Sequence, residues 1–330
     1  MISLNFSSLL NTIATLFFLM AVGFVAGKLG IINSTASKNL SRLIITIAQP
    51  ALIIYSLMKM KYSAENLELG LKSLLFGIAI HILIAVLAFF AFSWFRDLNE
   101  RKLTEFATVL GNVGFVGFPI LESILGDKGL FMGAFFLISF HLTLWTWGIA
   151  ILARKRDDIK LTPKKVFLNY GTIPSLIGFS LFLLSGLLPP ILPASVNNVF
   201  AAIAPSVLTT LSYVSSLCTP ISMLITGALL ANRSVSQILG SGKIYYLCAV
   251  KLVAIPLLVC LLMKLLGFDV LWIQFGVIIT AMPSASTVTM LAELHDISPS
   301  YSAQTVGTTA LLSIVTMPCV IWLAQKIIEM

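Results

Sequence analysis

The stretch GNVGFVGFP, residues 111–119, combines residue types that could form a binding site inside a membrane. Three glycines, the Asn112 amide and Pro119 interrupt an apolar segment that is otherwise long enough to cross a bilayer. Proline lacks a backbone donor and glycine tolerates non-helical backbone, so the helix is expected to break here. Unpaired backbone groups are costly in lipid, and broken helices therefore persist where they line a cavity enclosed by protein.

A second break is expected at residues 281–286, AMPSAS, in another apolar segment. Helix N-termini at such breaks carry partial positive charge and unpaired N–H groups, which suit an anion and particularly a carboxylate. The Asn112 side chain offers a donor and an acceptor to a ligand, or it forms hydrogen bonds with the loosened backbone. The hydroxyls of Ser284 and Ser286 either contact a ligand or donate to helix carbonyls. The predicted substrate-binding residues are Asn112, Val113, Gly114, Gly117, Pro119, Met282, Pro283, Ser284 and Ser286.

Three further ionisable side chains could supply charge or couple transport to an ion. His141 titrates in a range that suits proton coupling, or it forms a hydrogen bond between helices. Lys251 could place positive charge in the cavity, although snorkelling or a structural partner is favoured. Glu122 lies toward the end of its apolar segment, and no carboxylate clearly occupies the membrane midplane. Sodium could bind carbonyls of unwound backbone, so sodium and proton coupling both stay open, and no cofactor is expected.

Composition places these residues in an integral membrane protein, because 58% of the 330 residues are hydrophobic and only 10% are charged. The net charge of +8 is explained by basic cytoplasmic loops and does not indicate nucleic acid as a partner. The four cysteines lie in apolar segments without metal-ligand spacing and are interpreted as packing residues. Apolar runs of about 20 residues predict an all-α membrane protein with spans at 9–27, 40–58, 71–95, 103–125, 130–153, 166–188, 199–230, 244–266, 273–294 and 301–328.

Loop charge predicts the orientation of these spans. Lys and Arg concentrate in the loops that follow odd-numbered spans, above all in the linker 154–165, RKRDDIKLTPKK. Basic loops stay in the cytoplasm, so both termini are expected outside, in a multi-pass protein of a bacterial inner (plasma) membrane. The first apolar run lacks a basic segment before it, which favours a retained helix over a cleaved signal peptide.

The linker separates two halves, 1–153 and 166–330, that have similar landmarks. Pro50 interrupts the second span and Pro119 the fourth, while Pro220 interrupts the seventh and Pro283 the ninth. Prolines are common in membrane helices, but their paired positions favour an internal duplication. An odd number of spans in each repeat inverts the second copy, which would bring the breaks in spans 4 and 9 together near the midplane.

The same residues carry a family resemblance. GNVGFVGFP followed by ILESILGD, with TAMPSASTVTMLAELHDISPSYSAQTVGTT and AQPALIIYSL, resembles the auxin efflux carrier family, which includes plant PIN-formed proteins and bacterial organic-acid permeases. The resemblance implies ten helices in two inverted five-helix repeats, crossover helices at spans 4 and 9, and a homodimer. It implies an elevator movement of a transport domain, spans 3–5 and 8–10, against a scaffold of spans 1, 2, 6 and 7. Asn112 and Pro119 match the family's first crossover, and Pro283 matches the second.

Two departures from the plant members bear on the substrate. Plant members have a lysine shortly after the second crossover, where this chain reads Leu291, Ala292 and Glu293, and their cytoplasmic loop is often much longer than 154–165. A small organic anion such as a dicarboxylate is therefore expected, with auxin-like acids in the same broad class.

The expected function is a secondary membrane transporter that moves a small organic anion by elevator-type alternating access, with membrane lipid as its surroundings. The alternatives are an ion-coupled symporter of another substrate class, or a channel or sensor that uses the same fold. An intramembrane enzyme is not expected, because the sequence has no mid-span aspartate pair, GxSG motif or HExxH motif.

Overall fold

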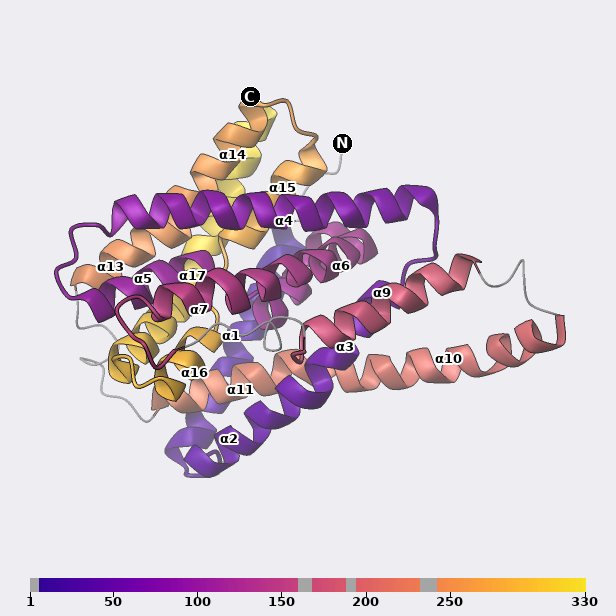
Figure 1. The fold of residues 1–330 in the computed structure, drawn as a ribbon, viewed down its shortest axis with the longest axis horizontal. Helices are drawn as coiled ribbons and strands as arrows, with labels where there is room; N and C mark the ends of the chain where they lie inside the picture. Colours follow the sequence, from indigo (N-terminus) through magenta and orange to yellow (C-terminus); the bar gives the residue numbers. More distant parts are fainter. Residues whose placement is uncertain (1–5, 160–167, 188–193, 232–241) are drawn as a thin grey trace.

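The computed structural model describes residues 6–159, 168–187, 194–231 and 242–330, and these are almost entirely helical (Figure 1). The first half contains α1 (Phe6–Lys28), α2 (Ser34–Leu43), η1 (Ile44–Ala48), α3 (Gln49–Met58), α4 (Ala64–Ala91), α5 (Leu98–Val109), η2 (Val113–Gly117), α6 (Phe118–Thr143), η3 (Leu144–Gly148) and α7 (Ile149–Leu152). The second half contains α9 (Thr172–Leu187), α10 (Ala194–Ser216), α11 (Cys218–Ala231), α13 (Gly242–Ala249), η4 (Val250–Ala254), α14 (Ile255–Leu265), α15 (Val270–Thr280), α16 (Thr287–Leu294) and α17 (Pro299–Glu329). The η elements are π-helical, and the expectation of an all-α membrane protein is confirmed for the described residues.

Seven helical segments of the described chain are long and apolar enough to cross a membrane, and shorter apolar helices lie at Thr172–Gly186 and Val270–Ala281. One of the seven, Val113–Leu152, has 40 residues. At 1.5 Å per residue that segment would extend about 60 Å, twice the hydrocarbon thickness of a bilayer. Gly126 interrupts it with φ 61° and ψ −149°, a conformation that favours glycine. Ten spans, the number expected from the sequence, stays a prediction.

Polar side chains fix where helices begin at the polar edges of the molecule. Ser63 Oγ accepts a hydrogen bond of 3.1 Å from Asn66 N at the start of α4. Asp97 Oδ1 accepts one of 2.8 Å from Glu100 N at the start of α5. Each side chain satisfies a first-turn N–H that has no intrahelical acceptor. The Asp97 cap matters for function, because α5 is the helix that ends at the first break.

The break in the fourth expected span does not fall at Pro119. Pro119 lies in the first turn of α6, where its missing N–H needs no intrahelical acceptor, and η2 runs into α6 without interruption. The chain instead leaves the helix after Val109, and Leu110 is extended with φ −95° and ψ 102°. Pro50 is likewise in the first turn of α3, directly after η1, so it does not break its span. Pro283, by contrast, lies inside the break between α15 and α16.

The seventh expected span does change helix near its proline. Helix α10 ends at Ser216 and α11 begins at Cys218, so that Pro220 falls in the first turn of α11. The interruption is therefore at Leu217, just before the proline, for the same reason as at Pro119.

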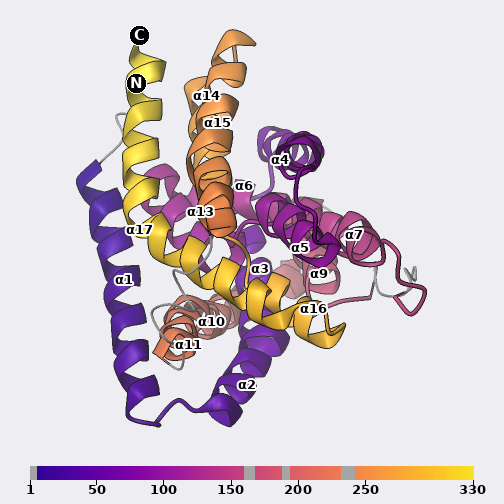
Figure 2. The same ribbon diagram turned by 90° about the vertical axis from the view of Figure 1, so that its left-hand side faces the viewer.

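The helices pack in two groups that can be followed in Figures 1 and 2. In one group α1 packs on α11, and α3 packs on α9 and α10. In the other, α4 packs on α5 and α6, α14 packs on α15 and α17, and α16 packs on α17. Helix α17 also packs on α5, which joins the two halves of the chain. Figure 2 shows that α1 begins and α17 ends at the same end of the molecule.

Small residues set the close approach of α1 and α11. A Cβ atom on Gly227 would collide with the backbone oxygen of Met20, and one on Gly23 would collide with the backbone of Leu224. Such small-residue contacts are typical of membrane helix pairs, because van der Waals packing rather than exclusion of water holds the helices together.

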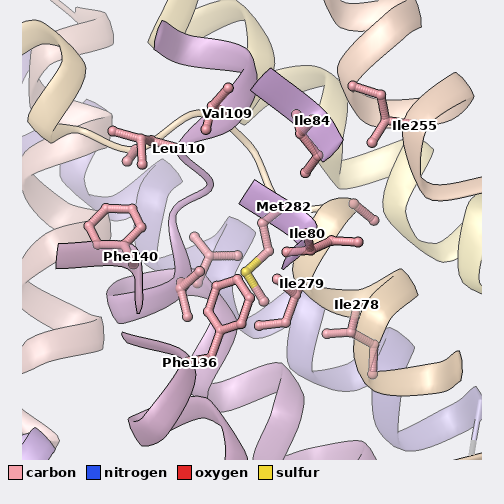
Figure 3. Close-up of a cluster of buried hydrophobic side chains, with 14 of the residues drawn as sticks. Ile80, Ile84, Val109, Leu110, Phe136, Phe140, Ile255, Ile278, Ile279 and Met282 are labelled. Atoms are coloured by element: carbon pink, nitrogen blue, oxygen red, sulfur yellow. The ribbon is translucent and has the colours of Figure 1, made fainter. Parts of the chain in front are cut away.

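An apolar layer packs directly against the two breaks (Figure 3). Ile80 and Ile84 come from α4, Phe136 and Phe140 from α6, and Ile278 and Ile279 from α15, and all six are buried. Met282, in the second break, lies among them and is fully buried. This layer fixes one side of the breaks in a dry core, so only their other side can face a ligand.

The α1–α11 contact gives a first testable expectation. Gly227→Ala should lower the melting temperature in detergent, with a cost of about 1–3 kcal/mol for overpacking. Alanine is normally a better helix former than glycine by about 1 kcal/mol. The expected change in stability is therefore opposite in sign to the change that helix propensity alone would give. Gly242→Ala is the matched control, since a Cβ at Gly242 meets no atom of the described residues within 4 Å. Equal melting temperatures for the two variants would contradict the close approach.

Candidate functional site

The two interrupted helices cross through their backbones. Gly111 and Ser284 form an antiparallel bridge, in which Asn112 N donates to Pro283 O at 2.8 Å and Ala285 N donates to Leu110 O at 2.9 Å. Backbone groups freed by one break are thus satisfied by the other, as an environment without water requires. The sequence expectation that residues 111–119 and 281–286 meet is in agreement with this geometry.

The carboxyl end of α5 is closed by the second half of the chain. Ser284 Oγ donates to Ala107 O at 2.9 Å, and Lys251 Nζ donates to Thr108 O at 2.8 Å. The last carbonyls of a helix have no intrahelical donor, so both bonds replace a missing partner. Ser284 N is held in turn by Thr309 Oγ1 of α17 at 3.2 Å. Of the two roles expected for the serines, ligand contact or a hydrogen bond to a helix carbonyl, Ser284 has the second.

Two helix N-termini begin at the crossing. Asn112 is the N-cap residue of η2 and Ser286 is the N-cap residue of α16, and neither side chain makes a capping hydrogen bond. The first N–H groups of a helix lack intrahelical acceptors and carry the positive end of its dipole. Both side chains are therefore left available at a site where N–H groups are already concentrated.

A pocket lies against this crossing. Four of the predicted residues line it, namely Asn112, Pro283, Ser284 and Ser286. The opposite walls come from α1, α11 and α17, and none of the described lining residues is charged. The remaining lining residues are Ile13, Leu16, Phe17, Met20, Val116, Ile120, Met223, Thr226, Val306, Ala310, Ser313, Ile314 and Met317.

Asn112 is the best placed of the predicted ligand groups. Only 8% of the residue is exposed, and its side-chain amide makes no hydrogen bond to any residue that the structure describes. An amide left without a partner at the wall of a pocket can both donate to and accept from a ligand. Its backbone N–H is already used by Pro283 O, which fixes where the side chain starts.

The other predicted residues of the two stretches lie beside the pocket rather than in its lining. Gly117 packs on Met282, because a Cβ on Gly117 would lie 2.6 Å from Met282 Sδ. A Cβ on Gly114 would lie 3.3 Å from Nε2 of Gln49, which places this glycine against α3. Val113 is buried in the core, and Pro119 is in the first turn of α6. These residues shape the crossing but are not part of the described lining.

His141 lies in α6 away from the described lining of the pocket. Its ring is buried against Gly171, where an added Cβ would collide with the imidazole. Neither ring nitrogen has a hydrogen-bond partner among the described residues. The structure therefore brings His141 neither to the crossing nor into the predicted hydrogen bond between helices.

Glu122 is also separate from the pocket. Lys59 Nζ lies 3.0 Å from Glu122 Oε1 and 2.7 Å from Asp127 Oδ1, which joins the end of α3 to α6. Burial alone would lower the pKa of the Lys59 ammonium, but hydrogen bonds to Asp127 and Glu122 outweigh it and hold that pKa above its usual range. The carboxylate is half exposed and serves an ion pair at the edge of the helices.

The pocket walls on α1, α11 and α17 were not predicted from the sequence. Met20, Met223 and Met317 line the pocket, yet apolar residues of a wall and of a lipid-facing surface have the same composition. The hydroxyl side chains of Thr226 and Ser313, inside apolar segments, are the sequence feature that could have indicated these walls. No group of three His, Cys, Asp or Glu residues that could hold a metal occurs in the described ranges.

The contact between Gly117 and Met282 can be tested by a double-mutant cycle. Gly117→Ala should cost about 1–3 kcal/mol of stability, because Met282 must move to admit the new methyl group. Met282→Ala removes that obstacle, so the two substitutions together should cost less than their sum. Melting temperatures of the single and double variants in detergent measure this coupling, and strict additivity would show that the residues do not touch.

Comparisons with known proteins agree with the geometry. A family model described as "Membrane transport protein" matches residues 8–321. The chain is 23% identical over 314 residues to a protein named "Uncharacterized transporter" from Methanothermobacter thermautotrophicus, covering 93% of this chain and 96% of that one. It is 25% identical over 234 residues to one named "Putative malonate transporter" from Rhizobium meliloti, covering 70% and 69%. A further protein named as an uncharacterized transporter, from Methanocaldococcus jannaschii, is 24% identical over 319 residues, covering 95% of this chain and 98% of that one. The chain therefore belongs to the membrane transport protein family, the auxin efflux carrier family that its crossover motifs resemble.

Proposed function

We propose that this protein is a secondary transporter that carries a small organic anion, with a carboxylate bound in the pocket at the crossing. The observation that carries the proposal is the pair of N-cap residues, Asn112 and Ser286, that line one pocket with uncommitted side chains. Two helix N-termini aimed at one place favour a negative charge. A relative named for malonate supports the same substrate class.

Binding at this site divides between a polar end and an apolar end. The carboxylate accepts hydrogen bonds from the Asn112 amide and from the Ser286 hydroxyl, and the positive dipole ends of η2 and α16 lie directly behind these two side chains. The carbon part of the substrate lies against the methionine and aliphatic side chains of α1, α11 and α17. A pocket with few polar groups and an apolar wall discriminates by the position of charge and by size.

The proposed architecture has ten spans in two inverted repeats. The first five are α1, then α2 to α3, α4, α5 to α6 as far as Gly126, and the rest of α6 to α7. The second five are α9, then α10 to α11, α13 to α14, α15 to α16, and α17. Three features support this division: the turn at Gly126, the antiparallel crossing of the fourth and ninth spans, and the shared end of α1 and α17.

The proposed mechanism is an elevator movement between the two packing groups. Spans 1, 2, 6 and 7 form the scaffold and spans 3–5 and 8–10 form the transport domain. The pocket lies between them, because α1 and α11 supply one wall and the crossing with α17 supplies the other. Lys59 of the scaffold pairs with Glu122 and Asp127 of the transport domain. Exposed ion pairs are worth at most about 1 kcal/mol, so this link can break in each transport cycle.

The proposed protein is a homodimer in a bacterial inner membrane, with both termini outside and the basic linker 154–165 in the cytoplasm. The excess of Lys and Arg in the loops after odd-numbered spans supports the orientation. Residues 160–165, the second half of the linker, lie outside the described residues.

Uptake of labelled malonate into proteoliposomes tests the proposed function. Asn112→Ala should reduce affinity for the anion roughly tenfold or more, because it removes hydrogen bonds to a charged group worth about 1.5–3 kcal/mol. Asn11→Ala is the matched control, since Asn11 is on the exposed face of α1. Wild-type uptake should saturate and show exchange with unlabelled anion.

Two results would contradict the proposal in different ways. Uptake by Asn112→Ala equal to that of wild type would remove the crossing as the binding site. Single-channel currents without saturable exchange would favour a channel that uses the same fold.

A further inference from the structure

Lys251 is a cation buried behind the proposed anion site. It lies in η4, inside the apolar segment Gly242–Leu265, and only 2% of the residue is exposed. Its Nζ donates to Thr108 O at 2.8 Å, at the carboxyl end of α5. No carboxylate of the described chain lies within ion-pair distance of this ammonium. The side chain points into the protein and does not snorkel to the membrane surface.

A charge is not needed merely to satisfy the carbonyl of Thr108. The carbonyl next to it, Ala107 O, is satisfied by the neutral hydroxyl of Ser284. A buried ammonium in a membrane costs several kcal/mol unless other charges or dipoles compensate for it. Lys251 therefore keeps a positive charge at low cost only where a negative charge can bind close to it, a condition that a simple hydrogen-bond donor would not need.

The helix ends at the crossing indicate that function. Helices α5 and α15 end there with the negative poles of their dipoles, while η2 and α16 begin there with positive poles. Lys251 neutralises the end of α5, whereas no basic side chain is recorded at the end of α15 within the described ranges. The sum of the four helix-dipole ends and the Lys251 ammonium is therefore a net positive charge at the crossing. The described pocket lining adds no charged side chain of its own.

We propose that Lys251 is the built-in counter-cation of the anion site, so that the substrate binds without a co-bound sodium ion. Lys251 acts as a positioning residue through α5, because its partner carbonyl is adjacent to the one that holds Ser284 of the pocket. The charge is felt across the crossing because electrostatic interactions are strong in a medium of low dielectric constant. This inference rests on the proposed transport of an organic anion.

The chain offers a matched control for this role. Lys264 also donates its Nζ to the last turn of another helix, at Ile327 O of α17, and neither residue belongs to the described pocket lining. A lysine at the outer end of a helix is an ordinary partner of the helix dipole. Lys264→Gln therefore makes the same exchange of an ammonium for an amide at a helix end without removing the proposed counter-charge.

The test compares Lys251→Gln, Lys251→Arg and Lys264→Gln with wild type in full-length protein. Binding of acetate, malonate and succinate is measured by calorimetry in sodium buffer and in choline buffer. Glutamine can still donate to Thr108 O, so Lys251→Gln should keep the melting temperature of the Lys264→Gln control while losing anion affinity at least tenfold. Arginine restores the charge, so Lys251→Arg should bind within about threefold of wild type, and wild-type affinity should be the same in both buffers.

Each contrary result has a distinct meaning. Unchanged affinity in Lys251→Gln, equal losses in the Gln and Arg variants, or a sodium requirement in wild type would each overturn the counter-cation. If Asn112→Ala abolishes binding while Lys251→Gln does not, the anion site stands and only the role of Lys251 fails. If wild type binds none of the three carboxylates, the proposed function fails and this inference fails with it.

Discussion

The mutual satisfaction of two broken backbones is the constraint on which the rest of this structure depends. A single helix that unwinds in lipid would expose N–H and C=O groups at a cost of several kcal/mol each. Here the hydrogen bonds between Asn112 and Pro283 and between Ala285 and Leu110 let two helices unwind together. The apolar layer around Met282 seals one side of the crossing, and the pocket occupies the other. The pairing that satisfies the backbone groups of the two breaks therefore also creates a polar site within the membrane.

The same need to satisfy backbone groups explains why several lysines donate to the carbonyls at helix ends. Lys102 donates to Leu152 O at the end of α7, Lys251 to Thr108 O and Lys264 to Ile327 O. Each lysine supplies a donor and a positive charge to a helix end that another helix presents. Lys251 differs because its helix end lies inside the crossing. The electrostatics of the site can therefore be set by a residue that does not line the pocket.

Sequence reasoning found the parts of the site that are anomalous for a membrane helix. Asn112, Pro283 and Ser286 stand out because each belongs to a short group of helix-interrupting and polar residues within an apolar run, and all three line the pocket. It placed the first break within residues 111–119 and expected Pro119 to interrupt the span, but a proline in a first turn continues a helix, and the non-helical residues are 110–112. It could not find Met20 or Met223, because a pocket wall and a lipid-facing surface look alike in sequence. Nor could it find the partner of Lys251, which lies on a distant helix.

The most direct test of the account is a distance between bound substrate and protein. Malonate labelled with ¹³C at its carboxyl groups can be bound to protein whose asparagine side-chain and threonine backbone nitrogens carry ¹⁵N, and dipolar recoupling in lipid bilayers then reports the nearest N–H groups. The account predicts carboxyl carbons about 4 Å from the side-chain nitrogen of Asn112, which lines the pocket, or from the backbone nitrogen of Thr287, at the start of α16. Bound malonate with no recoupling to either nitrogen would contradict a site at the crossing.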